Sequence, residues 1–158
     1  KNYRDSYGMF VSIGFLSNHE SCLRGKHFVI TKLFKEIKNI LDKKSKKITF
    51  GDLSIIRDWG WAPSYVEAIY KMTTAKKPDD YIIATGKSYS LKFLIDKSFE
   101  LAGLGESERF IEIKNENTRP NELKQSYLDP SKIEKSFNWK NALSMDEMIL
   151  KLLNNELF

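Results

Sequence analysis

The chain has 158 residues, of which 41% are hydrophobic and 13% aromatic, enough for one domain with an apolar core. No apolar run approaches the roughly 20 residues that span a membrane, so we expect no membrane partner. The net charge is +5, and the basic excess is concentrated in seven lysines between residues 32 and 47. We interpret these lysines as a solvated helix face and loop, and we expect no nucleic-acid partner, because no zinc-finger, RRM or helix-turn-helix pattern accompanies them.

The first third of the chain predicts a strand, a loop, a helix and a short strand. Residues 7–17 are nearly continuous in apolar and small residues, which is typical of a strand buried on both faces of a parallel sheet. Residues 18–27 are polar and are expected to form a loop. From Phe28 to Leu41 the apolar residues recur with helical spacing, and a short strand is expected at residues 48–50.

The stretch from Ile55 to Met72 is the most informative part of the sequence. Its Arg-Asp-Trp-Gly segment predicts a turn before a helix, in which Ser64 and Glu67 would form a capping box. Arg57 and Asp58 would then lie where a strand ends and a loop begins, which is where open α/β folds bind ligands. A surface turn in which these two side chains pair with each other or with solvent is the open alternative.

The rest of the chain predicts further strands and helices with recognisable boundaries. Strands are expected at residues 81–86 and 110–114. Helices are expected after three start signals, namely the Ser90 cap, Asp129 followed by Pro130, and a capping box of Ser144 and Glu147. Alternating strands and helices indicate an α/β fold, and the helix-rich tail indicates a small lid-like subdomain.

Several common catalytic and binding motifs are missing from the sequence. It contains no G-x-G-x-x-G, P-loop, H-E-x-x-H or G-x-S-x-G pattern, so we expect no complete cofactor cradle and no metal site within this chain. The single cysteine, Cys22, excludes an internal disulfide and fits a reducing compartment such as the cytoplasm.

The polar residues that remain form three clusters, each in a predicted loop or turn. The clusters are Asn18-His19-Glu20 with Arg24, then Arg57-Asp58, and then Arg119 with Glu122. A catalytic triad of the adjacent residues His19, Glu20 and Ser21 is disfavoured, because neighbours on a loop do not easily converge. Three separated arginines suit an anionic ligand such as a diphosphate, because the guanidinium fork matches phosphate oxygens.

Four consecutive blocks of sequence resemble one known family. They are residues 7–29, 53–72, 77–104 and 118–140, and they follow one another as in the GDP-mannose 4,6-dehydratase family of extended short-chain dehydrogenases/reductases. The Asn-His-Glu-Ser and Arg-Asp-Trp-Gly segments are specific to this branch. The resemblance implies an α/β fold that is the C-terminal part of a Rossmann-type extended enzyme.

The resemblance also implies that the chain is only half of such an enzyme. Residues 1–158 would hold the last Rossmann strands interleaved with the substrate-binding subdomain, whereas the glycine-rich loop and the catalytic Tyr-x-x-x-Lys would precede Lys1. The implied parent reaction converts GDP-mannose to GDP-4-keto-6-deoxymannose with bound NADP. The chain alone would then be inactive, and the full-length protein would be a homo-oligomer, either a dimer or a tetramer.

Site residues follow from the resemblance position by position. It implies that His19 and Arg24 contact the cofactor, and that the GDP-sugar is held by Asn18, Lys32, Arg57, Arg119 and Glu122. The sequence departs from the family pattern at Ile13, Cys22-Leu23 and Ile30-Thr31. A GDP-heptose 4,6-dehydratase, another nucleotide-sugar epimerase or dehydratase, and a non-catalytic nucleotide-sugar-binding module therefore remain as alternatives. Trp59 and Trp61 are expected to pack in the core rather than to stack on a base.

Overall fold

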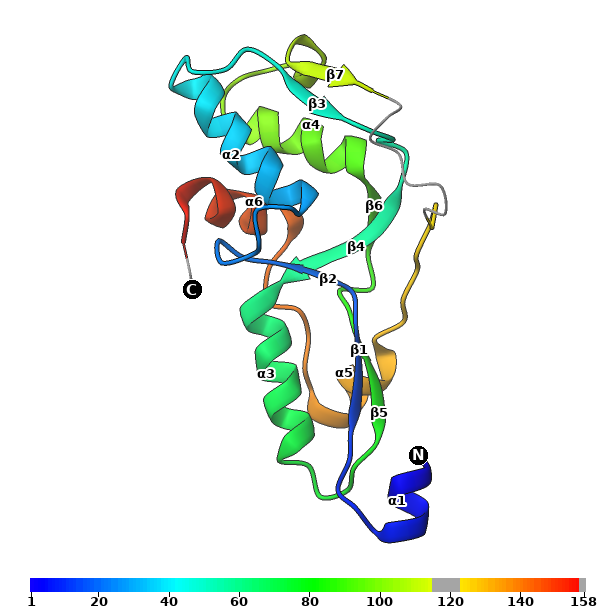
Figure 1. The fold of residues 1–158 in the computed structure, drawn as a ribbon. Helices are drawn as coiled ribbons and strands as arrows, with labels where there is room; N and C mark the ends of the chain where they lie inside the picture. Colours follow the sequence, from blue (N-terminus) through cyan, green and yellow to red (C-terminus); the bar gives the residue numbers. More distant parts are fainter. Residues whose placement is uncertain (115–122, 157–158) are drawn as a thin grey trace.

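The chain folds into two lobes joined by a small central sheet, as Figure 1 shows. The computed structural model describes residues 1–114 and 123–156, and Arg119 and Glu122 therefore lie outside the described residues. We name the lobes by their content. The helical lobe contains α2, β3, α4, β7 and α6, and the sheet lobe contains α1, β1, α3, β5 and α5.

The helical lobe is built on three helices that share one apolar core. These helices are α2 (Val29–Leu41), α4 (Leu91–Leu101) and α6 (Met145–Asn154), and a parallel pair of strands, β3 (Ile48–Phe50) and β7 (Ile111–Ile113), lies beside them. The helix predicted after residue 28 is confirmed, because its apolar stripe buries Leu33 and Ile37 completely. Leu41 ends the stripe and stays half exposed.

The central sheet contains β2 (Asn18–Glu20), β4 (Ile56–Trp61) and β6 (Ser88–Ser90), with β4 in the middle. Strand β2 runs parallel to β4, and β6 runs antiparallel to it. Two predictions are therefore wrong, since Asn18–Glu20 was expected in a loop and Arg-Asp-Trp-Gly in a turn. Both segments gain ladder hydrogen bonds that local composition does not reveal.

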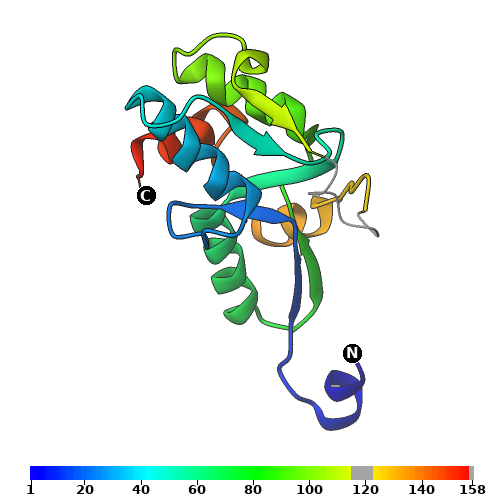
Figure 2. The ribbon, with the colours of Figure 1, turned by 45° about the horizontal axis from the view of Figure 1, so that its top comes forward.

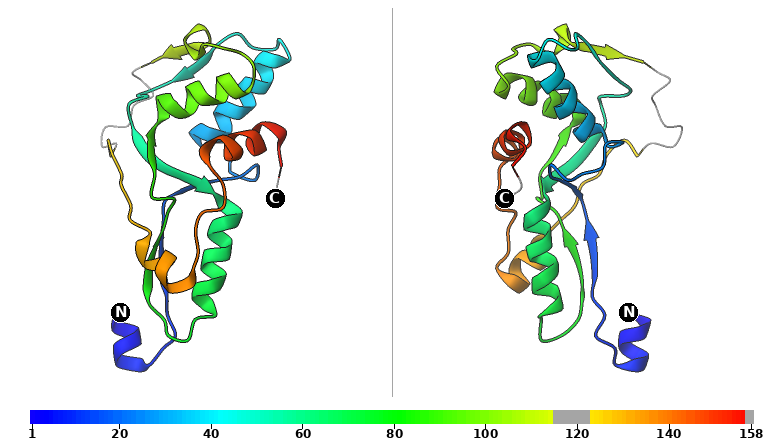
Figure 3. Two further views of the ribbon diagram at one scale, coloured as in Figure 1. Left: turned by 180° about the vertical axis from the view of Figure 1, so that it is seen from behind. Right: turned by 60° about the vertical axis from the view of Figure 1, so that its left-hand side comes forward.

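The sheet lobe pairs β1 (Ile13–Leu16) with β5 (Asp80–Ile83) in parallel, and Figure 3 shows α3 (Ala62–Thr73) and α5 (Ser131–Phe137) beside them. Its core is a second apolar cluster centred on Tyr65 and Trp139. The prediction of a long strand buried on both faces at residues 7–17 is wrong in length and burial. Strand β1 is short, and Phe15 is 57% exposed.

The N-terminal helix α1 (Asn2–Tyr7) stands apart from the other elements, as Figure 2 shows. It ends at Gly8, whose φ of 61° is the left-handed conformation typical of a helix C-terminus. Arg4 ties it to β5 by donating to both carboxylate oxygens of Asp80, at 2.5 and 2.8 Å. This bidentate pair is the main polar link between α1 and the sheet lobe.

The helix start signals are confirmed in part. The capping box of Ser144 and Glu147 opens α6, and the Ser90 side chain accepts from the backbone N–H of Phe93 at the start of α4. The capping box predicted at Ser64 is wrong, because α3 begins earlier, at Ala62. Helix α5 begins at Ser131, one residue later than predicted, and Asp129 accepts from the Ser131 N–H. A short 3-10 helix, η1 (Ser107–Arg109), precedes β7.

Across the described parts of the chain, no helix combines the length and apolar character that a membrane crossing needs.

Candidate functional site

A cavity of about 400 Å³ lies between the central sheet, α2 and β3, and we call it the β3–β4 cavity. It is lined by basic, aromatic and apolar side chains together with backbone of β3 and the loop after it. These residues are Asn18, Arg24, His27, Phe28, Val29, Lys32, Thr49, Phe50, Gly51, Asp52, Ile55, Arg57, Trp59, Leu91 and Lys124. The basic groups at its wall suit an anionic ligand, and the aromatic and aliphatic groups suit an apolar ring.

Only alternate side chains of β4 reach the cavity, because successive side chains of a strand point to opposite faces. Arg57 and Trp59 line the cavity, whereas Asp58 between them lies on the other face with Ser17. The Arg57 guanidinium donates to the carbonyl of Ile56 at 2.8 Å and to that of Leu123. The alternative in which Arg57 pairs with Asp58 is therefore wrong.

Two further cations reach the cavity from α2 and from the loop before it. Lys32 donates to the carbonyl of Thr49, and its Nζ lies 5.4 Å from the centre of the Phe50 ring. The Arg24 guanidinium lies 3.9 Å above the Phe28 ring and donates to the carbonyl of His19. Lys32 and Arg24 are thus each held in place by a backbone carbonyl and an aromatic ring.

Arg24 also pairs with a deeply buried carboxylate. Its Nε lies 3.2 Å from Oε2 of Glu20, whose side chain is only 1% exposed. Burial penalises the carboxylate and raises the pKa of Glu20 to about 7, although the charge of Arg24 acts in the opposite direction. Burial is therefore the stronger effect. The pair fixes Arg24 at the edge of the cavity while part of its positive charge is matched within the protein.

The face of β4 opposite the cavity is a closed hydrogen-bonded cluster. Asp58 is 1% exposed, and it accepts from the Ser17 hydroxyl at 2.9 Å and from the backbone N–H groups of Thr85 and Gly86 at 3.0 and 2.8 Å. Three donors satisfy this buried carboxylate, so its role is to join β4 to the ends of β1 and β5. Asp58 is consequently not a ligand group of the cavity.

The structure brings together some of the predicted site residues and separates others. Asn18, Arg24, Lys32 and Arg57 line one cavity although they are far apart in the sequence. His19 is separated from them because it pairs with Gly60 in the sheet and faces Tyr65 on the opposite side. Arg119 and Glu122 lie outside the described residues, while Lys124 lines the cavity. Among the described residues, no group of three His, Cys, Asp or Glu side chains is arranged to hold a metal.

The sequence analysis missed some cavity residues. Asp52 and Lys124 form an ion pair at 2.6 Å at the cavity rim, and the hydrogen bond from Lys124 lowers the pKa of Asp52. Nothing in the local pattern singles out these two residues, because they are 72 positions apart in the chain. Phe50 and Trp59 were recognisable only as apolar members of strands or core, and Trp59 is confirmed as a packing residue at 3% exposure.

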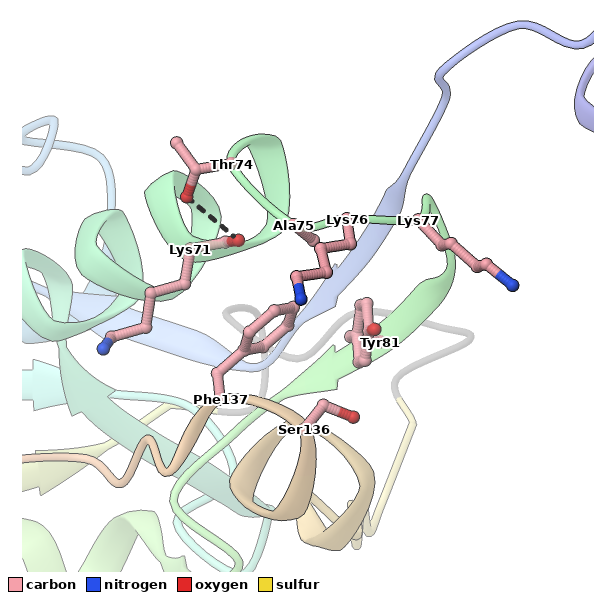
Figure 4. Close-up of a pocket in the computed structure, with 8 residues that line it drawn as sticks. All are labelled: Lys71, Thr74, Ala75, Lys76, Lys77, Tyr81, Ser136 and Phe137. Atoms are coloured by element: carbon pink, nitrogen blue, oxygen red, sulfur yellow. Dashed lines mark hydrogen bonds between the residues drawn. The ribbon is translucent and has the colours of Figure 1, made fainter.

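A second, wider hollow lies at the far end of the sheet lobe, between the end of α3 and α5 (Figure 4). Its walls carry the exposed Lys76 and Lys77, and its floor is the pair of rings of Tyr81 and Phe137, with centres 5.1 Å apart. Of the predicted site residues that the structure describes, none lines this hollow. The β3–β4 cavity gathers four of the predicted residues and is therefore the stronger candidate.

Comparison with protein families places the chain beside one group of enzymes. The family model described as GDP-mannose 4,6 dehydratase matches residues 1–152. GDP-mannose 4,6 dehydratase 1 of Arabidopsis thaliana is 35% identical over 156 residues, which are 99% of this chain and 43% of that protein. The GDP-mannose 4,6-dehydratase of Vibrio cholerae is 31% identical and covered to 49%. The chain therefore spans about half the length of the relatives it matches.

Solved structures share the fold at lower sequence identity. The structure of RMD from Pseudomonas aeruginosa complexed with NADPH superposes with a TM-score of 0.86 at 15% identity, over 98% of this chain and 50% of that one. The dTDP-glucose 4,6-dehydratase of Bacillus anthracis in complex with NAD gives a TM-score of 0.81 at 16% identity, over 96% and 46%. The predicted α/β fold of an extended short-chain dehydrogenase/reductase is confirmed.

Proposed function

Because the chain belongs to the GDP-mannose 4,6-dehydratase family, we propose that it is the substrate-binding half of a GDP-mannose 4,6-dehydratase, a lyase. The proposed parent reaction converts GDP-mannose to GDP-4-keto-6-deoxymannose. One observation carries the proposal. The four residues Asn18, Arg24, Lys32 and Arg57, which come from separate elements, line a single cavity.

In this proposal the chain binds and orients the nucleotide part of the sugar nucleotide. Arg57 and Lys32 would neutralise the diphosphate, because charge-assisted hydrogen bonds to phosphate oxygens are stronger than neutral ones. Asn18 would add a neutral donor on the same face of the sheet. Arg119 and Glu122 are proposed to hold a phosphate and the ribose hydroxyls, and the presence of Lys124 in the cavity wall supports this proposal.

The cofactor proposed for the parent enzyme is NADP. When bound, it supplies the hydride acceptor and donor for a reaction that oxidises C4, loses water across C5–C6 and returns the hydride to C6. The residues of this chain fit a nicotinamide dinucleotide in part, because His19 on β2 and Arg24 in the loop after β2 offer polar atoms, while the sequence has no glycine-rich loop. We therefore propose that His19 and Arg24 contact the cofactor and that its main cradle lies outside residues 1–158.

The same proposal assigns the organisation of the whole protein. Residues 1–158 would hold the last Rossmann strands interleaved with the substrate-binding subdomain. The complete enzyme would be a homo-oligomer, a dimer or a tetramer, in a reducing compartment that suits the lone Cys22.

Titration with GDP tests the proposal. Arg57→Ala should weaken GDP binding by roughly 2–4 kcal/mol, or at least about 30-fold, because a charge-assisted contact in a partly desolvated site is lost. Arg119→Ala should have an effect of similar size, and Glu122→Gln a smaller one, because the amide still accepts one hydrogen bond.

Arg109→Ala is the matched control, since this arginine is 69% exposed and pairs with Glu106 at the surface. Its GDP affinity should equal that of the unmodified chain. Unchanged GDP affinity in both the Arg57 and the Arg119 variants would end the proposal of a diphosphate clamp.

A further inference from the structure

The imidazole of His19 is held at one nitrogen by the backbone. Nδ1 lies 2.8 Å from the carbonyl oxygen of Ser17. A carbonyl oxygen accepts hydrogen bonds and has no proton to donate, so Nδ1 must carry the proton in this contact. In the neutral ring the other nitrogen, Nε2, is then a hydrogen-bond acceptor. None of the described residues bonds to Nε2, and His19 is only partly buried.

The plane of the His19 ring is fixed by Tyr65. The two rings stack with centres 5.3 Å apart and an angle of 30° between their planes. This contact exists because His19 and Gly60 are partners in the parallel pairing of β2 and β4 and share one face of the sheet. Tyr65 enters that face from the first turns of α3.

Tyr65 is itself immobilised from three directions. Its hydroxyl lies 2.5 Å from the Ser17 hydroxyl, and the Trp139 ring meets it edge-on with centres 6.2 Å apart. Gly60 supplies the third wall, because a Cβ at that position would lie 2.5 Å from the Tyr65 ring. The side chain is 1% exposed. The Tyr65 hydroxyl thus bonds to Ser17, the residue whose carbonyl also holds His19.

We propose that Tyr65 is a positioning residue for His19, which it keeps stacked with Nδ1–H on the Ser17 carbonyl so that Nε2 is presented as an acceptor to a ligand. The chemistry of the ligand group follows. A carboxamide or a hydroxyl donates to a neutral Nε2, whereas a phosphate oxygen offers it no proton. This inference deepens the proposed function, in which His19 contacts the cofactor. The tautomer and the ring stacking tested below can fail while the GDP-binding proposal stands.

Long-range proton–nitrogen correlation spectra of the imidazole rings test the proposal directly. A single tautomer gives two well-separated nitrogen resonances, whereas exchange between tautomers draws them together. The chain has one other histidine, His27, which is exposed and whose ring nitrogens have no hydrogen bond within the described residues. His19 should show the separated resonances of the Nδ1–H form, and His27 should show averaged ones in the same sample.

Two substitutions of Tyr65 separate positioning from packing. Tyr65→Phe keeps the stacked ring, so the His19 resonances should remain separated. Tyr65→Leu removes the ring, and the His19 resonances should converge toward those of His27. A His19 signature that averages in the unmodified chain, or that survives unchanged in Tyr65→Leu, would overturn the proposal.

Should Tyr65→Leu fail to fold, the unmodified chain still decides the matter. Cross-relaxation between the ring protons of His19 and Tyr65 is expected from rings stacked at 5.3 Å. Its absence, with other contacts of Tyr65 visible, would overturn the proposal as well.

Discussion

The two lobes differ in how completely they bury their own apolar side chains. The helical lobe encloses a core in which Leu33, Leu94 and Phe99 are fully buried. The sheet lobe has a smaller core around Tyr65 and Trp139, while Phe15 and Val66 on its strands and helix are 57% and 64% exposed. The helical lobe therefore buries more of its apolar side chains than the sheet lobe does, although Leu41 and Ile113 in the helical lobe are also 50% and 59% exposed.

Strand pairing in the sheet lobe also leaves apolar surface uncovered. Within the described residues, β1 pairs with β5 and has no strand on its other side. An exposed parallel strand with apolar side chains is a ready template for another strand. Strand β1 therefore presents a free edge within the described part of the chain, and the relatives are about twice as long as this chain.

The first prediction concerns activity, where the expected effect is complete. The chain alone should not turn over GDP-mannose with NADP added, because it lacks a glycine-rich loop and a Tyr-x-x-x-Lys pair. Product formation measured by chromatography checks this. Turnover by the 158-residue chain would contradict this prediction.

The second prediction concerns association of the isolated chain. The exposed side chains of Ile13, Phe15 and Leu16 on β1 should drive self-association through the sheet lobe. Light scattering should give a mass above that of the 18.4 kDa monomer, rising with concentration. Phe15→Lys should lower the association, and Leu41→Lys, at an exposed site of the helical lobe, should not. A monodisperse monomer with a sharp melting transition would contradict this prediction.

The third prediction compares a buried side chain of the helical lobe with an exposed side chain of the sheet lobe. Leu94→Ala should lower the free energy of unfolding by about 2–5 kcal/mol, because it opens a cavity in a fully buried core. Phe15→Ala should change it by less than about 0.5 kcal/mol at concentrations where the chain is monomeric, because exposed sites contribute little. Denaturant titration measures both. An equally large loss for Phe15→Ala would mean that the sheet lobe buries this ring.

The contrast between lobes also explains which sequence predictions succeeded. Helix α2 was predictable because its spacing of apolar residues reports a complete, local burial pattern. The strand around Arg57 was not, because Asp58 is polar and belongs in a strand only when Thr85 and Gly86 satisfy its carboxylate. Such a partnership is tertiary, and no local pattern reveals it.

The candidate site was predictable to a similar extent. The resemblance named Asn18, Lys32 and Arg57, and the structure places all three in one cavity. It also assigned Asn18 to the substrate and its neighbour His19 to the cofactor, and the structure places these two side chains on opposite faces of β2. It grouped Arg24 with His19, whereas in the structure Arg24 lines the same cavity as Asn18. The role of Tyr65 beside His19 depends on the register of β2 and β4 and had no signal in the sequence.

The fourth prediction concerns Asp58, which joins the central sheet to the sheet lobe. Asp58→Ala should lower the free energy of unfolding by about 3 kcal/mol, because buried donors left unpaired cost roughly 1–3 kcal/mol each and some will find water. Asp42→Ala is the control, since Asp42 pairs with Lys44 at the surface. Hydrogen exchange should quicken in β1 and β5 and remain slow in α2 and α4. Uniform loss of protection in both lobes would show that Asp58 does not act at their junction.

The last prediction concerns the buried carboxylate of Glu20. Its pKa is raised from the ordinary 4.5 to about 7, so the folded chain binds this proton more tightly than the unfolded chain does. The resulting stability is fully present below about pH 4.5 and is lost as the pH rises toward 7. At about 1.4 kcal/mol per pKa unit, the loss is on the order of 3 kcal/mol at most.

Burial raises the pKa of Glu20 and the charge of Arg24 lowers it, and substitution of Glu20 tests which effect is larger. Glu20→Gln should abolish most of the decline in stability between pH 5 and pH 8, because the amide does not ionise. Glu67→Gln is the matched control, since Glu67 is exposed and pairs with Lys71 one helical turn on. Denaturant midpoints measured across this pH range give the slope for each variant. If the Arg24 charge outweighed burial, Glu20 would stay ionised throughout, and the unmodified chain and Glu20→Gln would then show the same slope over this range.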